Sequence, residues 1–148
     1  MTHLPEPQPV THYLLVHTLM GGVPVEQSDG TAVPATLCYD VRDPYAVALT
    51  FRPAEGPVRW LLAREMLVRG LAGPAGVGAV RVWPALDAQL HPSVVIDLRS
   101  PDGRLSVRVS APAVERFLAR TIAIVPIGDE GLHLDAELAA LLGTSDAE

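Results

Sequence analysis

The chain has 148 residues, of which 49% are hydrophobic and 19% are charged, and its mean hydropathy is +0.26. This composition excludes a disordered protein, and the length suits one domain that buries its own core without disulfides or metals. All 11 basic residues are arginines, and the 17 acidic residues give a net charge of -6. That balance argues against non-specific nucleic-acid binding, which depends on neutralising phosphates.

Side chains that carry chemistry are few and scattered along the sequence. A single cysteine, Cys38, can form no internal disulfide, and the five histidines lack the spacing of a zinc site. The N-terminal residues have no apolar run of signal-peptide length, and no stretch approaches the roughly 18 apolar residues of a membrane helix. We therefore expect a cytoplasmic protein with no membrane span.

The first part of the chain predicts an arm, a strand and a long loop. Residues 1–10 contain three prolines and are expected to form an extended N-terminal arm. Residues 11–19 are rich in β-branched and aromatic residues, which favours a strand. The polar, glycine-rich residues 19–32 predict a loop that is either functional or mobile. The expected domain covers residues 11–143, and residues 144–148 form a C-terminal tail.

Two further strands follow the loop, at residues 33–40 and 45–52. In the second of them hydrophobic residues alternate, which is typical of a half-buried antiparallel strand. The residues expected to face inward are Tyr45, Val47, Leu49 and Phe51.

Residues 58–63 begin as another strand and pass into a short helix. Its buried side is expected to hold Leu62, Met66 and Leu67, and the glycines and proline of residues 70–76 end it.

The second half of the chain repeats this order. Strands are predicted at residues 78–84, 91–100 and 103–111, and the last two are joined by a Ser-Pro-Asp-Gly turn. A helix opens at Pro112, and its apolar stripe consists of Val114, Phe117 and Leu118. The overall order predicts an α+β domain with two antiparallel halves.

A last short helix is predicted at residues 134–143, where Gly143 stops it. Its leucines lie on one side and either close the core or offer a face to a partner: Leu134, Leu138, Leu141 and Leu142.

Candidate catalytic residues have simpler structural explanations. Asp40 and Asp43 could form a carboxylate pair, but they flank a connection between strands, where aspartates bind backbone amides. Cys38 lies in an apolar strand and is expected to be a core residue. Trp60 and Trp83 could stack on bases, but a core or subunit-interface role is preferred. No nucleophile, base and oxyanion hole come together, so we expect no catalytic, metal or cofactor site.

The stretch YDVRDPYAVALTF (residues 39–51) resembles YxxxDPYAVxxTF, the signature of the SsgA-like proteins, an actinobacterial family of sporulation and cell-division regulators. VRWLLAREMLVRGLAGPAGVGAVRVWP (58–84) and SAPAVERFLARTIAIVPIGDE (110–130) resemble two further family segments. The resemblance spans roughly residues 33–142, and such blocks in register are far more specific than one short motif.

Membership in this family would imply a fold, an assembly and a set of partners. The implied fold has two antiparallel β-sheets with short helices, similar to the whirly-type single-stranded nucleic-acid binders, and it assembles as a homotrimer. The implied role is non-enzymatic: an adaptor at the division septum that positions septa and recruits or supports the tubulin-like protein FtsZ or sister SsgA-like proteins. Which subtype the chain represents stays open.

The motif residues are expected to be mainly structural, without an assigned partner-binding role: Tyr39, Asp43, Pro44, Tyr45, Phe51, Trp60, Arg64, Gly70, Arg81, Trp83, Pro84, Pro112, Phe117, Leu118, Arg120 and Pro126.

Arg64 and Arg120 either contact partners or form ordinary ion pairs with Glu65 and Glu115. The alternative function is a single-stranded nucleic-acid-binding module, suggested by fold analogy alone. It would require a continuous positive groove built from Arg59, Arg64, Arg81, Arg99 and Arg108.

Overall fold

The computed structural model describes residues 8–19, 29–52 and 56–146. These ranges contain seven strands and three helices, in the order β1 (Val10–Leu19), β2 (Asp29–Tyr39), β3 (Ala46–Phe51), β4 (Val58–Ala63), α1 (Arg64–Gly70), β5 (Val80–Leu86), β6 (Pro92–Ser100), β7 (Gly103–Ser110), α2 (Ala111–Ile124) and α3 (Glu130–Asp146). The α+β class and the order of strands and helices are therefore confirmed.

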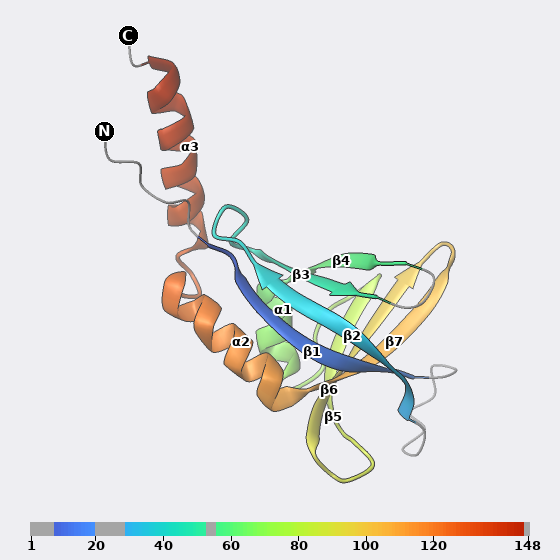
Figure 1. Ribbon diagram of the computed structural model, residues 1–148. Helices are drawn as coiled ribbons and strands as arrows, with labels where there is room; N and C mark the ends of the chain where they lie inside the picture. The colour runs from blue at the N-terminus through green and yellow to red at the C-terminus, as the bar shows by residue number, and fades with distance from the viewer. Residues whose placement is uncertain (1–7, 20–28, 53–55, 147–148) are drawn as a thin grey trace.

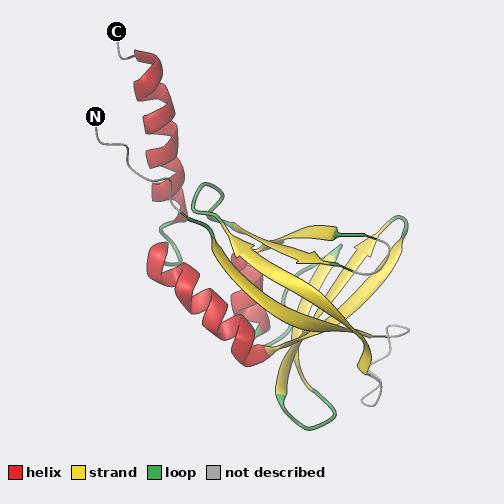
Figure 2. Cartoon of the chain, viewed as in Figure 1, coloured by secondary structure: helices red, strands yellow, loops and turns green. Residues whose placement is uncertain are grey.

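All seven strands belong to one antiparallel sheet, with the order β4-β3-β2-β1-β7-β6-β5. The sheet curls into a half-barrel (Figures 1 and 2), so the prediction of two separate sheets is wrong. β1 joins the halves because it pairs with β2 along most of its length and with β7 through His17, Thr18 and Leu19. β1 and β7 are far apart in sequence, and hydrophobic periodicity identifies strands but not their distant partners.

Several element boundaries differ from those expected. β1 already begins at Val10, and β2 begins at Asp29, so the last four residues of the expected loop, 29–32, belong to a strand. Most of the expected N-terminal arm and residues 20–28 of that loop lie outside the described residues.

Tyr45 does not face inward with the other alternating residues of β3. Val47, Leu49 and Phe51 are buried as expected, but Tyr45 precedes the strand and is 53% exposed. The turn before β3 explains the difference. The Ala46 amide donates a hydrogen bond to the Asp43 carbonyl, so the turn extends to Ala46 and Tyr45 lies within it. The alternation of a strand does not extend into a hydrogen-bonded turn.

α2 forms as its sequence predicts. The Ser110 hydroxyl accepts a hydrogen bond from the Ala113 amide, Pro112 lies in the first turn, and the apolar stripe is buried at Val114, Phe117 and Leu118. A side chain that caps the first turn satisfies an amide that would otherwise lack a partner. The helix packs on β1, β6 and β7, and it also contacts α1.

α3 projects away from the sheet (Figure 1), and it is longer than the predicted helix of residues 134–143. It continues through Asp146, past Gly143 and into the segment expected to be a tail. Leu134 is half-buried, whereas Leu138, Leu141 and Leu142 are 55%, 66% and 63% exposed. The three exposed leucines do not close the core, and a partner-binding face of this helix stays a prediction.

The core lies between the inner face of the sheet and helices α1 and α2. Gly70 ends α1 against this core, where a Cβ would lie 2.8 Å from Val82 Cβ and closer still to Val82 Cγ1. Val82 is fully buried, so neither residue has room to move away. The close contact between α1 and β5 therefore requires glycine at this position.

We expect the substitution Gly70→Ala to lower the free energy of unfolding by about 1–3 kcal/mol, because the added methyl group overlaps Val82. Urea denaturation followed by circular dichroism measures this difference. Gly73→Ala is the matched control, since a Cβ there meets no atom within 4 Å. Equal stability of the two variants would contradict the prediction.

Candidate functional site

Arg64 is a fully buried cation at the junction of β4 and α1. Its Nη2 atom donates to the Glu130 carboxylate at 2.8 Å, and its Nη1 atom donates to the Val125 carbonyl at 2.7 Å. A longer contact of 3.4 Å joins Nη1 to Thr121 Oγ1. A buried charge is stable only when it is paired and hydrogen-bonded. Arg64 therefore ties α1 to the end of α2 and to the first residue of α3.

Glu130 uses both carboxylate oxygens in this arrangement. Oε1 accepts from Arg64, and Oε2 accepts from the Gly128 amide at 2.8 Å. Gly128 has a φ of +99°, a backbone conformation that glycine adopts without strain. The hydrogen bond from Arg64 is the main cause that lowers the pKa of the Glu130 carboxyl below its ordinary value. The carboxylate is therefore ionised at neutral pH and holds the connection between α2 and α3.

Tyr39 connects the same cation to the turn before β3. The Arg64 guanidinium lies over the Tyr39 ring, 4.9 Å from its centroid, and the Tyr39 hydroxyl donates to the Pro44 carbonyl at 2.9 Å. A cation over an aromatic face is attracted by the π electrons of the ring. Burial raises the pKa of the Tyr39 hydroxyl, which keeps it protonated and able to donate.

Asp40 and Asp43 build this turn. The Asp40 carboxylate accepts from the Arg42 amide at 2.9 Å and forms an ion pair with the Arg42 side chain, and these bonds lower the pKa of the carboxyl. The Asp43 amide donates to the Asp40 carbonyl at 2.9 Å, and the Asp43 carbonyl accepts from Ala46. The Asp40 side chain binds a backbone amide as predicted, whereas the bonds that Asp43 contributes to the turn come from its backbone.

The ion pairs expected for Arg64 and Arg120 are wrong. Arg64 pairs with Glu130 and not with its neighbour Glu65, which is exposed. Arg120 donates to the Thr11 carbonyl of β1 at 3.3 Å instead of pairing with Glu115. Glu65 is a neighbour of Arg64 in sequence, but the Arg64 side chain is buried and its partner is Glu130, a residue far along the chain. Sequence reasoning did not select Glu130, although this acid closes the VPIGDE segment.

Exposed apolar side chains lie close in sequence to the residues of the buried ion pair, at the corner between α2 and α3. We call this set the corner surface: Tyr45 (53% exposed), Ile124 (45%), Ile127 (45%) and Leu132 (67%). A Cβ on Gly131 would lie 3.6 Å from the Tyr45 hydroxyl, which places Tyr45 beside the first turn of α3. Contiguous exposed apolar groups are typical of surfaces that bind other proteins.

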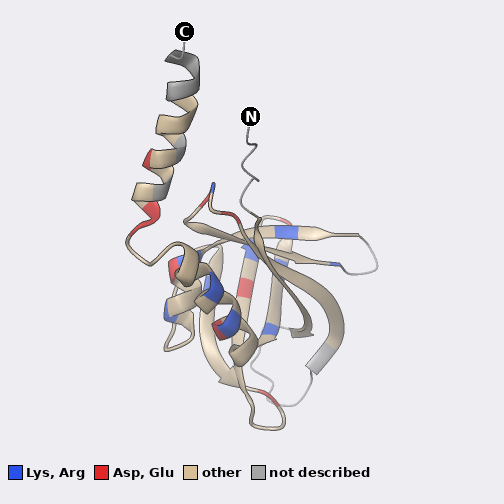
Figure 3. Ribbon diagram, turned by 60° about the vertical axis from the view of Figure 1, so that its left-hand side comes forward, with Lys and Arg blue, Asp and Glu red and all other residues tan. Residues whose placement is uncertain are grey.

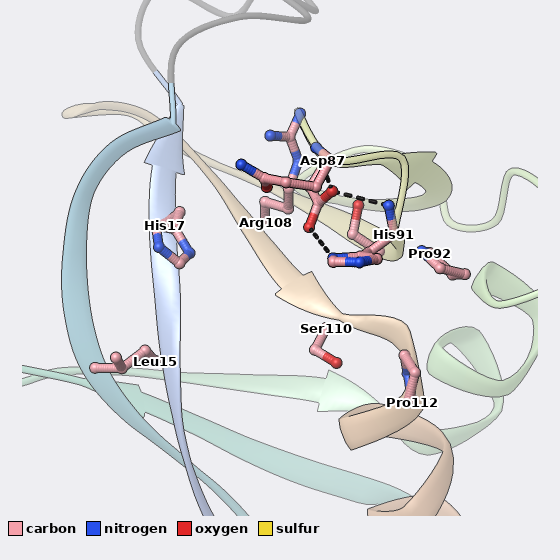
Figure 4. A pocket seen from close by; sticks show the side chains of 10 residues that line it. Leu15, His17, Asp87, His91, Pro92, Arg108, Ser110 and Pro112 are labelled. Carbon is pink, nitrogen blue, oxygen red and sulfur yellow. Dashed lines mark hydrogen bonds and ion pairs between the residues drawn. The ribbon is translucent and has the colours of Figure 1, made fainter.

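A polar pocket of about 600 Å³ lies elsewhere, between β1, β7 and the loop that joins β5 to β6 (Figure 4). Asp87 accepts from the backbone amides of Gln89 and His91, and its carboxylate lies 3.4 Å from His91 Nδ1. Those amide bonds lower the pKa of Asp87 and indicate a loop-forming role. Within the described ranges, no group of three histidine, cysteine or acidic side chains is arranged to hold a metal ion.

Cys38 is half-buried in β2 and accepts a weak hydrogen bond from Thr11 Oγ1 at 3.8 Å. The prediction that Cys38 is a core residue is wrong, because it faces the opposite side of β2 from the buried core residues Leu37 and Tyr39. Among the described helices, none has both the length and the apolar character needed to cross a membrane.

Comparison with known proteins places the chain in a family. Residues 33–130 match the family model described as Streptomyces sporulation and cell division protein, SsgA. The chain is 45% identical over 124 residues to the sporulation-specific cell division protein SsgB of Streptomyces coelicolor, an alignment that covers 82% of this chain and 90% of the relative. The chain belongs to the SsgA family.

Two solved structures of SsgA-family proteins share the fold. One is a structure described under the words "Mutations in SsgB correlate to longitudinal cell division during sporulation of Streptomyces coelicolor". It matches with a TM-score of 0.77 and 41% sequence identity, over 85% of this chain and 95% of that chain. The other is an SsgA-like sporulation-specific cell division protein from Thermobifida fusca, with a TM-score of 0.80, 30% identity and coverage of 95% and 99%.

The family assignment confirms the resemblance seen in the sequence. This SsgA-family member is a sporulation-specific cell-division protein, and the family is non-enzymatic. Its named relatives at about 40–45% identity are SsgB proteins.

Seven of the sixteen SsgA motif residues selected from the sequence are buried, in the core or in the Arg64 cluster (Arg64, Glu130 and Tyr39). The buried ones are Tyr39, Pro44, Phe51, Arg64, Gly70, Phe117 and Leu118. Trp60 and Trp83 are half-buried, and Trp60 packs against the core. The exposed ones are Asp43, Tyr45, Arg81, Pro84, Pro112, Arg120 and Pro126.

We expect Arg64→Met to lower the free energy of unfolding by about 3–5 kcal/mol, because it leaves the Glu130 carboxylate and the Val125 carbonyl without their cation. Arg69→Met is the matched control, since Arg69 lies on the same helix and is exposed. Thermal and urea denaturation of both variants measure the effect. An Arg64→Met variant as stable as the control would contradict the role assigned to the ion pair.

The same ion pair predicts a dependence of stability on acid. The pKa of Glu130 is lower in the folded state than its ordinary value of 4.5, so the unfolded state binds a proton more readily. The contribution of Glu130 to the free energy of unfolding is therefore fully present above pH 4.5. It is lost as the pH falls through the lower pKa of the folded state. We expect Glu130→Gln to be less stable than the native chain at pH 7, with a smaller difference near pH 3. Urea midpoints at both pH values test this, and a difference that grows in acid would contradict it.

Proposed function

We propose that the protein acts as an oligomeric adaptor in sporulation-specific division, at the septum on the cytoplasmic side. In this role it helps to position septa and recruits or supports FtsZ or sister SsgA-like proteins. The single observation that carries the proposal is the corner surface, an exposed apolar set held in place by a buried ion pair, in a family of cell-division proteins.

The shape and charge of α3 support this proposal. The helix extends from the corner surface into solvent with its leucines exposed, so it has an apolar face available to another chain. Its described charged side chains are acidic (Figure 3). α2 has two exposed arginines, Arg116 and Arg120, and one exposed acid, Glu115. Opposite charges on neighbouring helices suit packing between copies, in keeping with the proposed homotrimer.

The alternative, a single-stranded nucleic-acid-binding module with a whirly-like fold, stays a prediction that the positions of the arginines do not favour. Arg64 is buried in an ion pair, and Arg59 lies on β4, at the sheet edge opposite β5 and Arg81. Arg64 therefore cannot contribute to a groove on the surface, and such binding needs a continuous positive path along the phosphates.

We expect the double substitution Ile127→Ser and Leu132→Ser to weaken self-association and FtsZ capture while leaving the melting temperature nearly unchanged, because both side chains are exposed. Light scattering coupled to size exclusion measures the assembly, and pull-down with purified FtsZ or a sister SsgA-like protein measures capture. Leu86→Ser, at an exposed position on β5, is the control.

Each part of the proposal can fail separately in this experiment. A native chain that is strictly monomeric removes the oligomer, and no capture of either protein removes the adaptor role. Full assembly and capture by the double variant would show that the corner surface is not the contact.

A further inference from the structure

The outer face of β5, β6 and β7 carries a cluster of arginines around one buried carboxylate. Asp97 on β6 is 1% exposed, and it accepts hydrogen bonds from Ser106 Oγ at 2.5 Å, Arg104 Nε at 2.7 Å and Arg99 Nε at 3.2 Å. Burial alone would raise the pKa of Asp97, but the bonds from Ser106 and Arg104 outweigh it and the pKa is lowered. Asp97 is thus a fixed anion that orients two arginines.

Arg99 and Arg104 keep much of their binding capacity. They lie directly opposite each other on β6 and β7, where two like charges would repel without Asp97 between them. Each gives only its Nε atom to Asp97, and in the described part of the chain the terminal guanidinium nitrogens donate to no other group. The two side chains are 47% and 40% exposed. These free nitrogens can bind carboxylates from outside in the fork geometry that arginine favours.

β5 adds a third cation and an aromatic ring to this face. Arg81 lies directly opposite Asp97 in the sheet and is exposed, and Trp83 follows on the same side of the strand. The charged residues of β5, β6 and β7 are mainly basic (Figure 3), with Asp97 the acid among four arginines: Arg81, Arg99, Arg104 and Arg108. This face is positive although the chain has a net charge of -6.

An apolar cavity of about 630 Å³ adjoins the arginine face at the edge of β5. Trp83, Pro84 and Val77 line it, Arg81 lies at its rim, and Val77 is 90% exposed. The size is within the range of pockets that bind small groups, and the lining suits an apolar side chain.

The edge of β5 cannot accept an added strand from a partner. The Val82 amide and carbonyl are both bonded to Ala75, at 2.9 and 2.8 Å, and Pro84 has no amide hydrogen. A ligand on this side must therefore be recognised through side chains: acids on the arginines and an apolar group in the cavity.

We propose that this face binds an acidic peptide segment of a partner protein, with its carboxylates on Arg81, Arg99 and Arg104 and one apolar side chain beside Trp83 and Val77. The site lies apart from the corner surface and does not depend on it. A peptide fits better than a nucleic acid, because the cluster has a carboxylate at its centre, few cations and an apolar cavity for a side chain.

The test uses the full chain and a short fluorescein-labelled peptide of aspartates interrupted by leucine and phenylalanine, measured by fluorescence anisotropy. We expect binding that weakens with salt and falls about tenfold in Arg81→Gln, equivalent to about 1.4 kcal/mol. Arg81 is chosen because it is exposed and gives no hydrogen bond to Asp97, so the variant should fold. Arg59→Gln, an equal charge change on β4, is the control and should bind normally.

Three further probes separate the contributions. A peptide with serines in place of its apolar residues should bind more weakly, which tests the cavity. The corner variant Ile127→Ser and Leu132→Ser should bind the acidic peptide normally, so a failure of the proposed adaptor surface is distinguishable from a failure here. An oligothymidine of similar length should bind poorly.

Tighter binding of oligothymidine, no peptide binding at millimolar concentration, or equal binding by Arg81→Gln and native chain would overturn the proposal.

Discussion

The buried ion pair between Arg64 and Glu130 organises the helical side of this protein. A cation with 1% exposure cannot remain in a core without a carboxylate and a carbonyl to bind, so the chain must bring the end of α2 and the start of α3 to it. Tyr39 stacks on the same cation and carries the constraint to the turn before β3. The position of the corner surface and the point where α3 leaves the domain both follow from this pairing.

The protein uses arginine and carboxylate in two different ways. In the Arg64 cluster the terminal nitrogens of the cation are bound internally, so the pair stabilises structure and offers nothing to solvent. Around Asp97 the arrangement differs. One buried carboxylate orients two arginines, and the terminal nitrogens of these arginines remain exposed. In the proposed adaptor role, the same residue types would supply both the rigidity of the domain and its contacts with partners.

Much of the fold could be predicted because it depends on local physics. The alternation in β3, the apolar stripe of α2 with its Ser110 cap, and the turn at Asp40 and Asp43 each form from residues that are close in sequence. The family motifs identified the family correctly for the same reason, since they preserve local spacing. The role of these residues was predicted as mainly structural, and seven of them are buried in the core or in the Arg64 cluster.

The sequence by itself determined the α+β class, the order of the elements and the family, because periodicity, caps and motifs are short-range features. Only the tertiary structure decided that β1 pairs with β7 to make one sheet, that Glu130 is the partner of Arg64, that Tyr45 faces solvent and that the leucines of α3 are exposed. Each of these depends on contacts between residues far apart along the chain, or on which surfaces remain uncovered after folding. An amphipathic pattern states that a face is apolar, but the packing of the whole domain determines whether that face is buried.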